Sequence, residues 1–452
     1  MTDGQRDVVF VTQHYPPDKG GNAARIHDVA THLTDQGWGI TVLAPPPSYP
    51  PGTFERSSHR KQTESTDGVV VHRLWSWQPQ TENPGMGQRL AYYLLFGIHA
   101  MVWLLWNSRR YDVVVTTTPP ISTGAPGFLA SLLGKSWVVD VRDRWIDASI
   151  SLGYLEEGSL IERLSRRFQR LVLHRADRIS VTTPALGDSL QRTYGESLGE
   201  KTILVPNGVD VSRFQTREER DRTDEYGATD PEEEEERDHI DESGERDHID
   251  ESKERAPVTA SAKADGGEST VIYTGNLGSA QDLEAVIRAT SQLSHDGASL
   301  QLVGGGDVES ELRHLTDDLE LHDSVEFTGV VPREDVPALL GQATVGVAPL
   351  KSSDELAYAM PTKVYEYMAS GLPTVVTGRG EIADFVEKSG GGVHAANDPE
   401  QIARVLDELL DDDQRRQQLS ERGREYVKAN YDRRAIARHF SDELRQLVGD
   451  EH

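Results

Sequence analysis

Short apolar runs, each followed by a turn rich in glycine or proline and then by a stretch of helical spacing, recur along most of this chain. The first unit begins with Val8–Thr12, continues through Asn22–Gln36 with its apolar residues on one side, and returns at Ile40–Ala44 after Gly37. This order predicts a βαβ unit, in which the two strands are parallel. A chain that repeats the unit is expected to build open parallel sheets covered by helices.

The repeats fall into two blocks, which predict two domains. The first block has further strand-like runs at Tyr111–Thr117, Ser136–Val141 and Arg178–Thr182. In the second block, strands are expected at Val271–Thr274, Ser299–Val303, Val325–Thr328, Val345–Pro349 and Pro373–Thr377, with helices at Leu283–Ser291, Gln401–Leu410 and Arg433–Leu447. The predicted fold class is α/β with two Rossmann-like domains, at 1–214 and 269–430, and a closing helix within 431–452.

Residues 215–268 separate the two blocks and differ from them in composition. Large apolar side chains nearly vanish, Glu232–Glu236 is an unbroken acidic run, and a nine-residue unit beginning Glu-Arg-Asp-His-Ile-Asp occurs twice in succession. Such a segment cannot bury enough apolar surface to offset the entropy lost on ordering. We predict a disordered acidic insertion, and we do not expect His239 and His248 within it to form a metal site.

The chain is strongly acidic, with 75 Asp and Glu against 47 Lys and Arg, and a net charge of −28. This excess argues against free nucleic acid as a partner. There are 37 Arg but only 10 Lys. Acid excess with scarce Lys is typical of proteins from organisms that live in concentrated salt and suggests a halophilic archaeon, the alternative being an ordinary acidic cytosolic protein. The absence of Cys excludes disulfides, thiolate metal sites and a Cys nucleophile.

Residues 1–212 carry no net charge, although the rest of the chain is acidic. A neutral half on an acidic protein suggests a negatively charged partner, such as lipid head groups or phosphates. Ser159–Arg178 places six arginines among apolar residues, a pattern that fits docking on anionic lipid and equally a solvated helix face. The start of the chain shows no signal pattern. We expect a cytoplasmic protein, or one held peripherally on the inner face of the plasma membrane.

Leu90–Trp106 is a 17-residue uncharged run inside the first predicted domain. A membrane span needs about 20 apolar residues, and this run also contains Tyr92, Tyr93 and His99. Three interpretations stay open: a buried core helix, a helix lying on a membrane surface, and a span that would split the domain.

Met360–Gly371 carries the most specific local pattern. Pro361 starts a helix that places Lys363 and Glu366 three residues apart, and therefore on one face. A carboxylate in this place can accept hydrogen bonds from two ribose hydroxyls, and an ammonium can neutralise phosphate oxygens. The alternative is a solvent-exposed Lys–Glu pair worth only tenths of a kcal/mol.

Several motifs in a fixed order resemble family 4 of the retaining GT-B glycosyltransferases. They are the Met360-Pro-Thr-Lys-Val-Tyr-Glu-Tyr segment, Gln13-His-Tyr-Pro-Pro with Gly20-Gly21, Val141-Arg-Asp-Arg-Trp, Val205-Pro-Asn-Gly-Val-Asp, Tyr273-Thr-Gly-Asn-Leu-Gly and Phe327-Thr-Gly. The chain is especially similar to the bacterial N-acetylfucosamine transferase-like branch. The resemblance covers nearly everything except 215–268, and it implies the GT-B fold, with two Rossmann-like domains facing a cleft.

The same resemblance implies a site for a nucleotide-sugar donor, UDP-linked in most members, and a reaction with retention that needs no cofactor or metal. Glu366 would bind the ribose. The region of the diphosphate would hold the donor-binding residues Gly20, Gly21, Gly275, Asn276, Gln281, Lys351 and Lys363. The catalytic candidates would be Asp143, Arg142 and Lys363. The acceptor would be a glycan or a lipid-linked sugar, in cell-surface or protein glycosylation.

The sequence departs from the wider family at three places. Tyr358 stands where many members have a first acidic residue, Asn276 stands where many have a diphosphate-binding Arg, and Arg142-Asp143 occupies the region of a frequent His. Lys363 or Lys351 would supply the missing charge. Two other functions remain open: a nucleotide-sugar epimerase, and a non-catalytic GT-B-like partner subunit.

Overall fold

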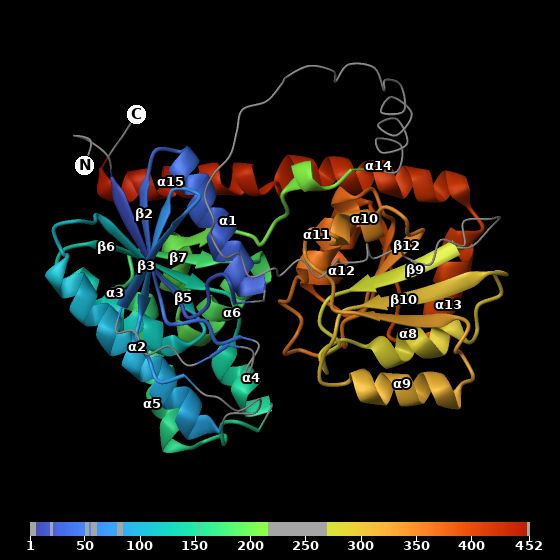
Figure 1. Cartoon of the computed structure of the whole chain (residues 1–452), viewed down its shortest axis with the longest axis horizontal. Helices are drawn as coiled ribbons and strands as arrows, with labels where there is room; N and C mark the ends of the chain where they lie inside the picture. Colours follow the sequence, from blue (N-terminus) through green and yellow to red (C-terminus); the bar gives the residue numbers. More distant parts are fainter. Residues whose placement is uncertain are drawn as a thin grey trace, which may run out of the picture.

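The computed structural model describes residues 6–18, 21–49, 54–55, 61–78, 85–151, 153–215 and 269–449. Two α/β domains lie side by side, one built from the first half of the chain and one from the second (Figure 1). The predicted acidic insertion, apart from Gln215, lies outside the described residues, as do His239 and His248.

The N-terminal domain is built on an eight-stranded sheet in the order β3-β4-β2-β1-β5-β6-β7-β8. All neighbours are parallel except β3 and β4, which form an antiparallel pair at one edge. The strands are β1 (Asp7–Val11), β2 (Gly39–Ala44), β3 (Lys61–Thr66), β4 (Val69–Leu74), β5 (Val113–Thr118), β6 (Ser136–Val141), β7 (Arg178–Val181) and β8 (Thr202–Leu204). The central strands are buried on both faces, which explains their nearly continuous apolar sequences.

Helices connect these strands and cover both faces of the sheet (Figure 1). They are α1 (Gly21–Asp35), α2 (Met86–Trp106), α3 (Gly124–Leu132), α4 (Trp145–Ser151), α5 (Leu160–Arg175) and α6 (Pro184–Tyr194), with short 3-10 turns η1 (Ile121–Thr123), η2 (Glu196–Lys201) and η3 (Val211–Arg213). Side-chain caps begin two of them. Ser159 accepts from the Glu162 amide at the start of α5, and Thr183 accepts from the Leu186 amide before α6.

The C-terminal domain has a six-stranded parallel sheet in the order β11-β10-β9-β12-β13-β14. Its strands are β9 (Ser269–Thr274), β10 (Ala298–Val303), β11 (Val325–Gly329), β12 (Val345–Ala348), β13 (Thr374–Val376) and β14 (Gly392–His394). Its helices are α8 (Leu283–Thr290), α9 (Glu309–Asp318), α10 (Val336–Leu340), α11 (Thr362–Ala369), α12 (Glu381–Ser389), α13 (Pro399–Leu410) and α14 (Asp413–Asn430). The predicted pair of parallel α/β domains is confirmed.

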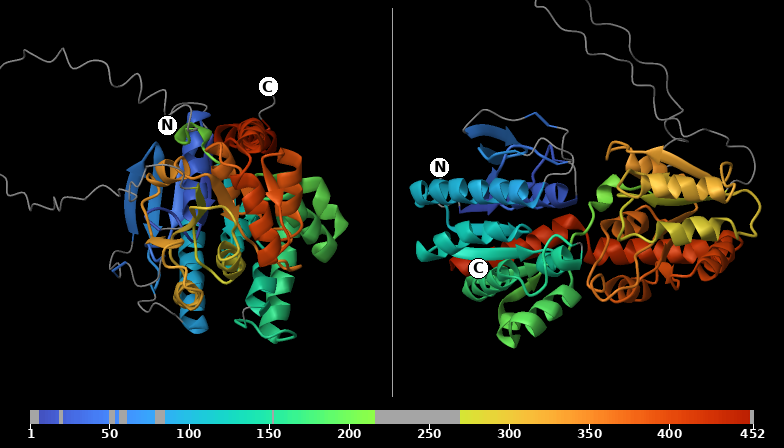
Figure 2. Two further views of the ribbon diagram at one scale, coloured as in Figure 1. Left: turned by 90° about the vertical axis from the view of Figure 1, so that its right-hand side faces the viewer. Right: turned by 90° about the horizontal axis from the view of Figure 1, so that it is seen from below.

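The last helix, α15 (Arg433–Val448), follows α14 after a short break and packs on α1 of the N-terminal domain. Seen from below, the red α14 and α15 run along both domains (Figure 2). Trp38 Nε1 donates to Ser441 Oγ at 2.8 Å, and Arg178 lies 3.3 Å from Glu443. Gly208, with φ +58°, lets the chain pass against α15, because a side chain there would meet Ile436 and the Tyr431 carbonyl.

One helix in the described part of the chain, Gly87–Trp106 within α2, is long and apolar enough to cross a membrane by length and composition. One face of α2 packs into the core of the N-terminal domain through Tyr92, Phe96, Ala100 and Leu104, each at most 3% exposed. The opposite face is exposed and apolar; it consists of Leu90, Leu94, Ile98, Val102, Leu105 and Trp106. The run predicted at Leu90–Trp106 is therefore a helix with one core face and one exposed face.

Candidate functional site

A cavity of about 520 Å³ lies between the two domains. Gly21 and Tyr49 line it from the N-terminal domain, and Arg433 lines it from the start of α15. The remaining wall comes mainly from the carboxyl ends of β9, β10 and β11 and from the first turns of α11. In open parallel sheets the carboxyl ends of the strands are where ligands bind, so the cavity occupies the expected place.

Helix α11 carries the charged residues predicted from the Met360–Gly371 segment. Pro361 precedes its first turn with φ −64°, and Gly371, with φ +71°, ends the segment where a side chain would be strained. The Tyr367 hydroxyl accepts from the Thr274 amide at 2.8 Å, so α11 is fixed against the end of β9. This contact holds the two walls of the cavity together.

Lys363 is a nearly buried cation, 9% exposed, that lines the cavity. Its Nζ lies 3.6 Å from the centre of the Tyr273 ring. It has no ion pair or hydrogen bond with any residue that the structure describes. Burial lowers the pKa of Lys363 well below its usual value, and Glu366 opposes this only in part. An anion that entered the cavity would supply the missing counter-charge.

Glu366 lines the same cavity, and its carboxylate likewise has no ion pair or hydrogen bond within the described chain. Burial raises the pKa of Glu366, while Arg333, Arg433 and Lys363, in decreasing order, lower it. The carboxylate is thus available to a ligand and is surrounded by positive charge.

Four further residues predicted to bind the donor line this cavity: Gly21, Gly275, Asn276 and Gln281. Gly275 has φ +125°, and a side chain there would approach Lys363 Nζ at 3.2 Å, so glycine keeps the ammonium in place. The Gln281 Oε1 atom is buried and has no partner among the described residues.

Two predicted donor residues are not among those that line the cavity. Lys351 is exposed, and its hydrogen bonds are made by its backbone: its amide donates to the Ala280 carbonyl at 3.1 Å, and its carbonyl accepts from the Ser353 amide at 3.0 Å. Gly20 lies outside the described residues, and its predicted role stays a prediction.

Arg142, a catalytic candidate, is paired inside the N-terminal domain rather than at the cavity. Its Nε lies 3.0 Å from Asp140, which also binds Arg25 at 2.8 Å and Ser180 at 2.7 Å. Burial lowers the pKa of Arg142 to about 10, and Asp140 opposes the shift. In this arrangement its guanidinium supports the core.

Asp143, the second candidate, also lies away from the cavity. It borders a small apolar hollow together with Trp145, Ile146 and Leu173, and its Oδ1 has no partner within the described chain. Burial raises the pKa of Asp143 to about 6, although Arg142 lowers it. Its predicted catalytic role stays a prediction.

Tyr358, which stands where the wider family has an acidic residue, joins the two domains. Its hydroxyl accepts from the Arg144 amide at 3.0 Å, and its carbonyl accepts from Thr183 Oγ1 at 2.9 Å. Nearby, the Ala185 amide donates to Glu381 at 3.3 Å. These hydrogen bonds fix the position of the N-terminal domain relative to the C-terminal domain.

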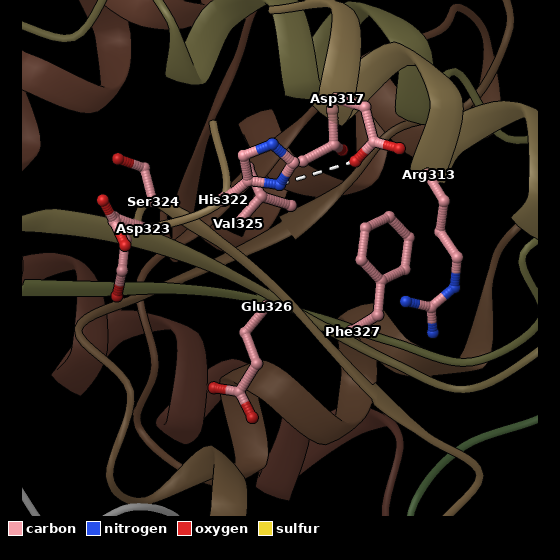
Figure 3. A pocket seen from close by; sticks show the side chains of 10 residues that line it. Arg313, Asp317, His322, Asp323, Ser324, Val325, Glu326 and Phe327 are labelled. Atoms are coloured by element: carbon pink, nitrogen blue, oxygen red, sulfur yellow. Dashed lines mark ion pairs between the residues drawn. The ribbon is translucent and has the colours of Figure 1, made fainter. Parts of the chain in front are cut away.

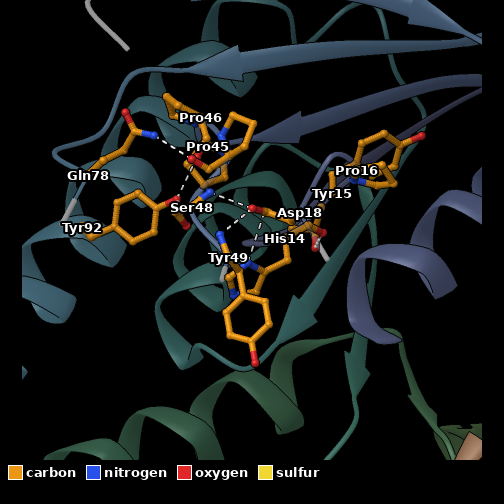
Figure 4. Close-up of polar contacts among 12 residues, drawn as sticks. His14, Tyr15, Pro16, Asp18, Pro45, Pro46, Ser48, Tyr49, Gln78 and Tyr92 are labelled. Carbon is orange, nitrogen blue, oxygen red and sulfur yellow. Dashed lines mark hydrogen bonds and ion pairs between the residues drawn. The ribbon is translucent and has the colours of Figure 1, made fainter. Parts of the chain in front are cut away.

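Sequence reasoning missed Tyr49, Arg333 and Arg433, which line the cavity. No motif marks them, because they lie in loops or at a helix start far from the donor segment. Tyr49 belongs to a polar cluster at the carboxyl ends of β1 and β2 (Figure 4). There Asp18 accepts from the amides of Ser48 and Tyr49 at 2.6 and 2.8 Å and lies 3.3 Å from His14 Nδ1.

A second hollow, of about 670 Å³, lies on the outer edge of the C-terminal domain around β11 (Figure 3). It contains an exposed His322–Asp317 pair at 3.5 Å, and the Arg313 guanidinium lies 4.3 Å from the Phe327 ring. Its charged groups are solvated or paired, so it offers a ligand less than the cavity between the domains. In the part of the chain that the structure describes, no group of three or more His, Asp or Glu is placed to hold a metal ion.

Comparisons with known proteins agree with this architecture. The profile of the family described as Glycosyl transferase 4-like domain matches residues 20–208, and that of Glycosyl transferases group 1 matches residues 256–426. A protein of Escherichia coli described as a colanic acid biosynthesis glycosyl transferase, WcaI, is 22% identical over 96% of this chain and 98% of its own length.

Two solved structures share the fold. Sucrose-phosphate synthase from Thermosynechococcus elongatus has a TM-score of 0.69 at 18% identity, over 99% of this chain and all of that one. HepE from Anabaena, in complex with UDP, has a TM-score of 0.66 at 16% identity, over 97% of this chain and all of that one. The predicted GT-B arrangement of the two domains is confirmed.

Proposed function

Since the chain is a glycosyltransferase of the GT-B fold, we propose that it moves a sugar, with retention, from a UDP-linked donor to a glycan or lipid-linked acceptor in cell-surface or protein glycosylation. The observation that carries the proposal is the pair of unpartnered, opposite charges on α11, Lys363 and Glu366, in one cavity between the domains. A nucleotide sugar offers complementary groups, because its diphosphate is anionic and its ribose presents two hydroxyl donors.

The chemistry assigned to the cavity follows from these charges. The bond between the anomeric carbon and the β-phosphate oxygen breaks, and its electron pair leaves with the nucleoside diphosphate. The acceptor oxygen bonds to the same face of that carbon, and its proton passes to the departing phosphate. Lys363 stabilises the charge that grows on the phosphate, and its low polarity surroundings strengthen this effect.

The choice of UDP rests on the resemblance to family 4 and on HepE, whose structure holds UDP. The choice of acceptor rests on the relative WcaI, described as acting in colanic acid biosynthesis.

We further propose that no metal is required, since the ammonium of Lys363 balances the negative charge of the diphosphate. Turnover that survives a chelator and is not raised by Mg²⁺ or Mn²⁺ is the expected result, whereas metal-dependent turnover would contradict this part.

A thermal-shift screen of nucleotide sugars and nucleoside diphosphates at high salt tests the donor. A ligand that binds only the folded state raises Tm, and 100 times its Kd adds about 2.7 kcal/mol of stability. UDP and a UDP-sugar are expected to shift Tm together. No shift with any nucleotide would contradict the proposal, and an isomerised donor in the absence of acceptor would favour an epimerase.

We also propose that the N-terminal domain docks on an anionic membrane surface, at the inner face of the plasma membrane. α2 and α5 both contact α3, and the three helices lie together in Figure 1. Together they expose an apolar surface. On α5 this surface includes Leu160, Leu164 and Leu171, next to the exposed Arg167 and Arg170, which have no partner within the described chain. The apolar groups of this surface match the acyl chains of a lipid membrane, and its basic groups match the anionic head groups.

A further inference from the structure

Asp28 of α1 holds two arginines that come from distant parts of the chain. Arg433, at the start of α15, contacts its carboxylate, and Nη2 of Arg333, in the loop after β11, lies 3.6 Å from the same oxygen. The side chains of Asp28 and Arg433 are only 10% and 7% exposed. Because Asp28 belongs to the N-terminal domain and Arg333 to the C-terminal domain, the second pair crosses the domain boundary.

The two arginines also share the cavity with Glu366. Burial raises the pKa of Glu366, and Arg333 and Arg433 are the two strongest opposing influences, ahead of Lys363. Neither arginine forms an ion pair with Glu366 within the described chain. Their charges therefore act on the carboxylate across the cavity and leave its oxygens open to a ligand.

The two arginines differ in how firmly the surrounding chain holds them. Arg433 Nε donates to the Asn207 carbonyl at 3.2 Å, and its backbone amide donates to the Val209 carbonyl at 3.0 Å. Arg333 is 44% exposed, and its recorded ion pair is with Asp28. The Asp28 carboxylate offsets the repulsion between the two guanidinium groups, so it allows both cations to lie beside Glu366.

We propose that Arg333 and Arg433 are positioning residues, held by Asp28 on the wall of the cavity that Glu366 shares, so that recognition of the donor ribose is complete only when the two domains are joined through Asp28. The inference rests on the proposed function, because it takes Glu366 as the ribose ligand. The chemistry recognised is the 2′,3′-diol of a nucleoside diphosphate. An ionised carboxylate can accept both hydroxyls, whereas a carboxyl group that holds a proton accepts them less well.

The test compares UDP with 2′-deoxy-UDP by titration calorimetry on the full chain at high salt, with ADP and GDP and their 2′-deoxy forms measured in parallel. The comparison uses the ribonucleotide and the 2′-deoxynucleotide of whichever base binds most tightly. The wild type is expected to prefer the ribonucleotide by about tenfold or more, as a hydrogen bond to a charged group allows. Glu366→Gln is expected to remove most of that preference.

Arg333→Gln is expected to reduce the preference at least threefold, and Arg333→Lys, which keeps the charge, to retain most of it. In the Glu366→Gln background, Arg333→Gln should change the preference no further. The matched control is Arg288→Gln on α8, since Arg288 is also 44% exposed and pairs with Glu284 outside the cavity. It should leave both affinities unchanged.

Each other outcome overturns the inference. If Arg333→Gln weakens UDP and 2′-deoxy-UDP equally, Arg333 binds phosphate or only supports the fold. If it changes neither, Arg333 has no part in donor binding. If the wild type binds no nucleoside diphosphate at all, the proposed function itself fails, and the inference fails with it. In the first two outcomes, by contrast, the wild type still binds UDP, so the proposed function stands and only the inference fails.

Discussion

Lys363 and Glu366 lie one turn apart on α11 and line the same cavity, but their charged groups form no ion pair with each other within the described chain. The sequence left a solvent-exposed Lys–Glu pair open as the alternative. The structure instead buries Lys363, leaves Glu366 half-buried, and places both side chains on the wall of one cavity. Two unpaired charges cost stability in the empty protein, and such a cost is typical of binding sites.

Replacing the charged group of Lys363 or of Glu366 is expected to reduce sugar transfer strongly while the protein stays folded. Lys363→Met and Glu366→Gln, like the corresponding alanine variants, should lower kcat/KM by about a hundredfold or more, as the loss of a group that stabilises developing charge does. Lys363→Met should also raise Tm, because it removes a buried, unpaired cation. A radiochemical or coupled UDP-release assay measures the first effect and calorimetry the second. Near-normal turnover in both variants would contradict the site.

Donor binding is expected to take up a proton at Lys363. Burial lowers the pKa of this ammonium in the empty protein, and a bound diphosphate raises it again. Affinity for UDP should therefore rise as the pH falls towards the pKa of the empty site and level off below it. Calorimetric titrations with UDP at several pH values, in buffers of different ionisation enthalpy, measure the proton uptake as the slope of the observed binding enthalpy against the ionisation enthalpy of the buffer. Lys363→Met should remove the slope, and a slope that persists would assign the proton elsewhere.

Asp143 is expected to make the fold less stable as the pH rises. Its folded pKa of about 6 lies above the unfolded value of about 3.9, so the folded state holds its proton more tightly. The stabilisation is present at low pH and is lost as the pH rises from about 4 through 6, by up to about 3 kcal/mol at about 1.4 kcal/mol per unit. Urea unfolding at several pH values measures it.

Asp143→Asn should remove this pH dependence, since an amide does not titrate. An unchanged profile would show that the carboxyl is ionised in the folded protein. The resemblance to family 4 also predicts that Asp143→Ala strongly reduces transfer. The assay used for Lys363 and Glu366 checks this, and normal turnover would leave Asp143 a purely structural residue.

Charge reversal on α5 is expected to weaken membrane binding. Arg167→Glu with Arg170→Glu should lower co-sedimentation with anionic vesicles about tenfold or more, because each basic residue near such a surface contributes about 1 kcal/mol. Arg166 is unsuitable for this purpose, since it pairs with Glu162 at 2.6 Å and Asp147 at 2.8 Å. Arg288→Glu with Arg313→Glu, in the C-terminal domain, is the control. Equal partition of both double variants would contradict the docking surface.

Added salt is expected to stabilise the protein. A net charge of −28 repels itself, and raising ionic strength from about 0.1 to 1 M shortens the Debye length from about 10 to 3 Å. Tm should therefore rise steadily with KCl, as the proposed halophilic origin requires. A Tm that is flat or falls across this range would favour an ordinary acidic protein.

Much of the fold could be predicted because its signal is local. β1, α1 and β2 follow the predicted ranges to within a residue or two, and the same holds for β6 and α13. Two of the elements that were missed, β3 and α14, lack an apolar pattern. β3 has the sequence Lys-Gln-Thr-Glu-Ser-Thr at a sheet edge, and α14 buries only Gly423 and Val427. Their positions depend on neighbouring elements rather than on their own composition.

The site was predictable only where it coincides with one continuous segment. Lys363 and Glu366 lie in such a segment, but Arg333, Arg433 and Asp28 come together from three distant places, and no spacing reveals this. Arg142 and Asp143 were assigned to catalysis by the resemblance alone, and this role stays a prediction. In the structure Asp140, two residues before Arg142 on a buried strand, accepts a hydrogen bond from the Arg142 guanidinium and holds it in the core.

The return of α15 to the N-terminal domain has a consequence for how the protein is made. Ile436, Phe440 and Leu444 belong to the same core as β1 and β2. A ribosome releases these residues only after the whole C-terminal domain, so the first domain to leave the ribosome is the last to be completed. Until then the part of α1 that packs on α15 is exposed, and an incompletely packed domain of this kind is prone to aggregation on the nascent chain.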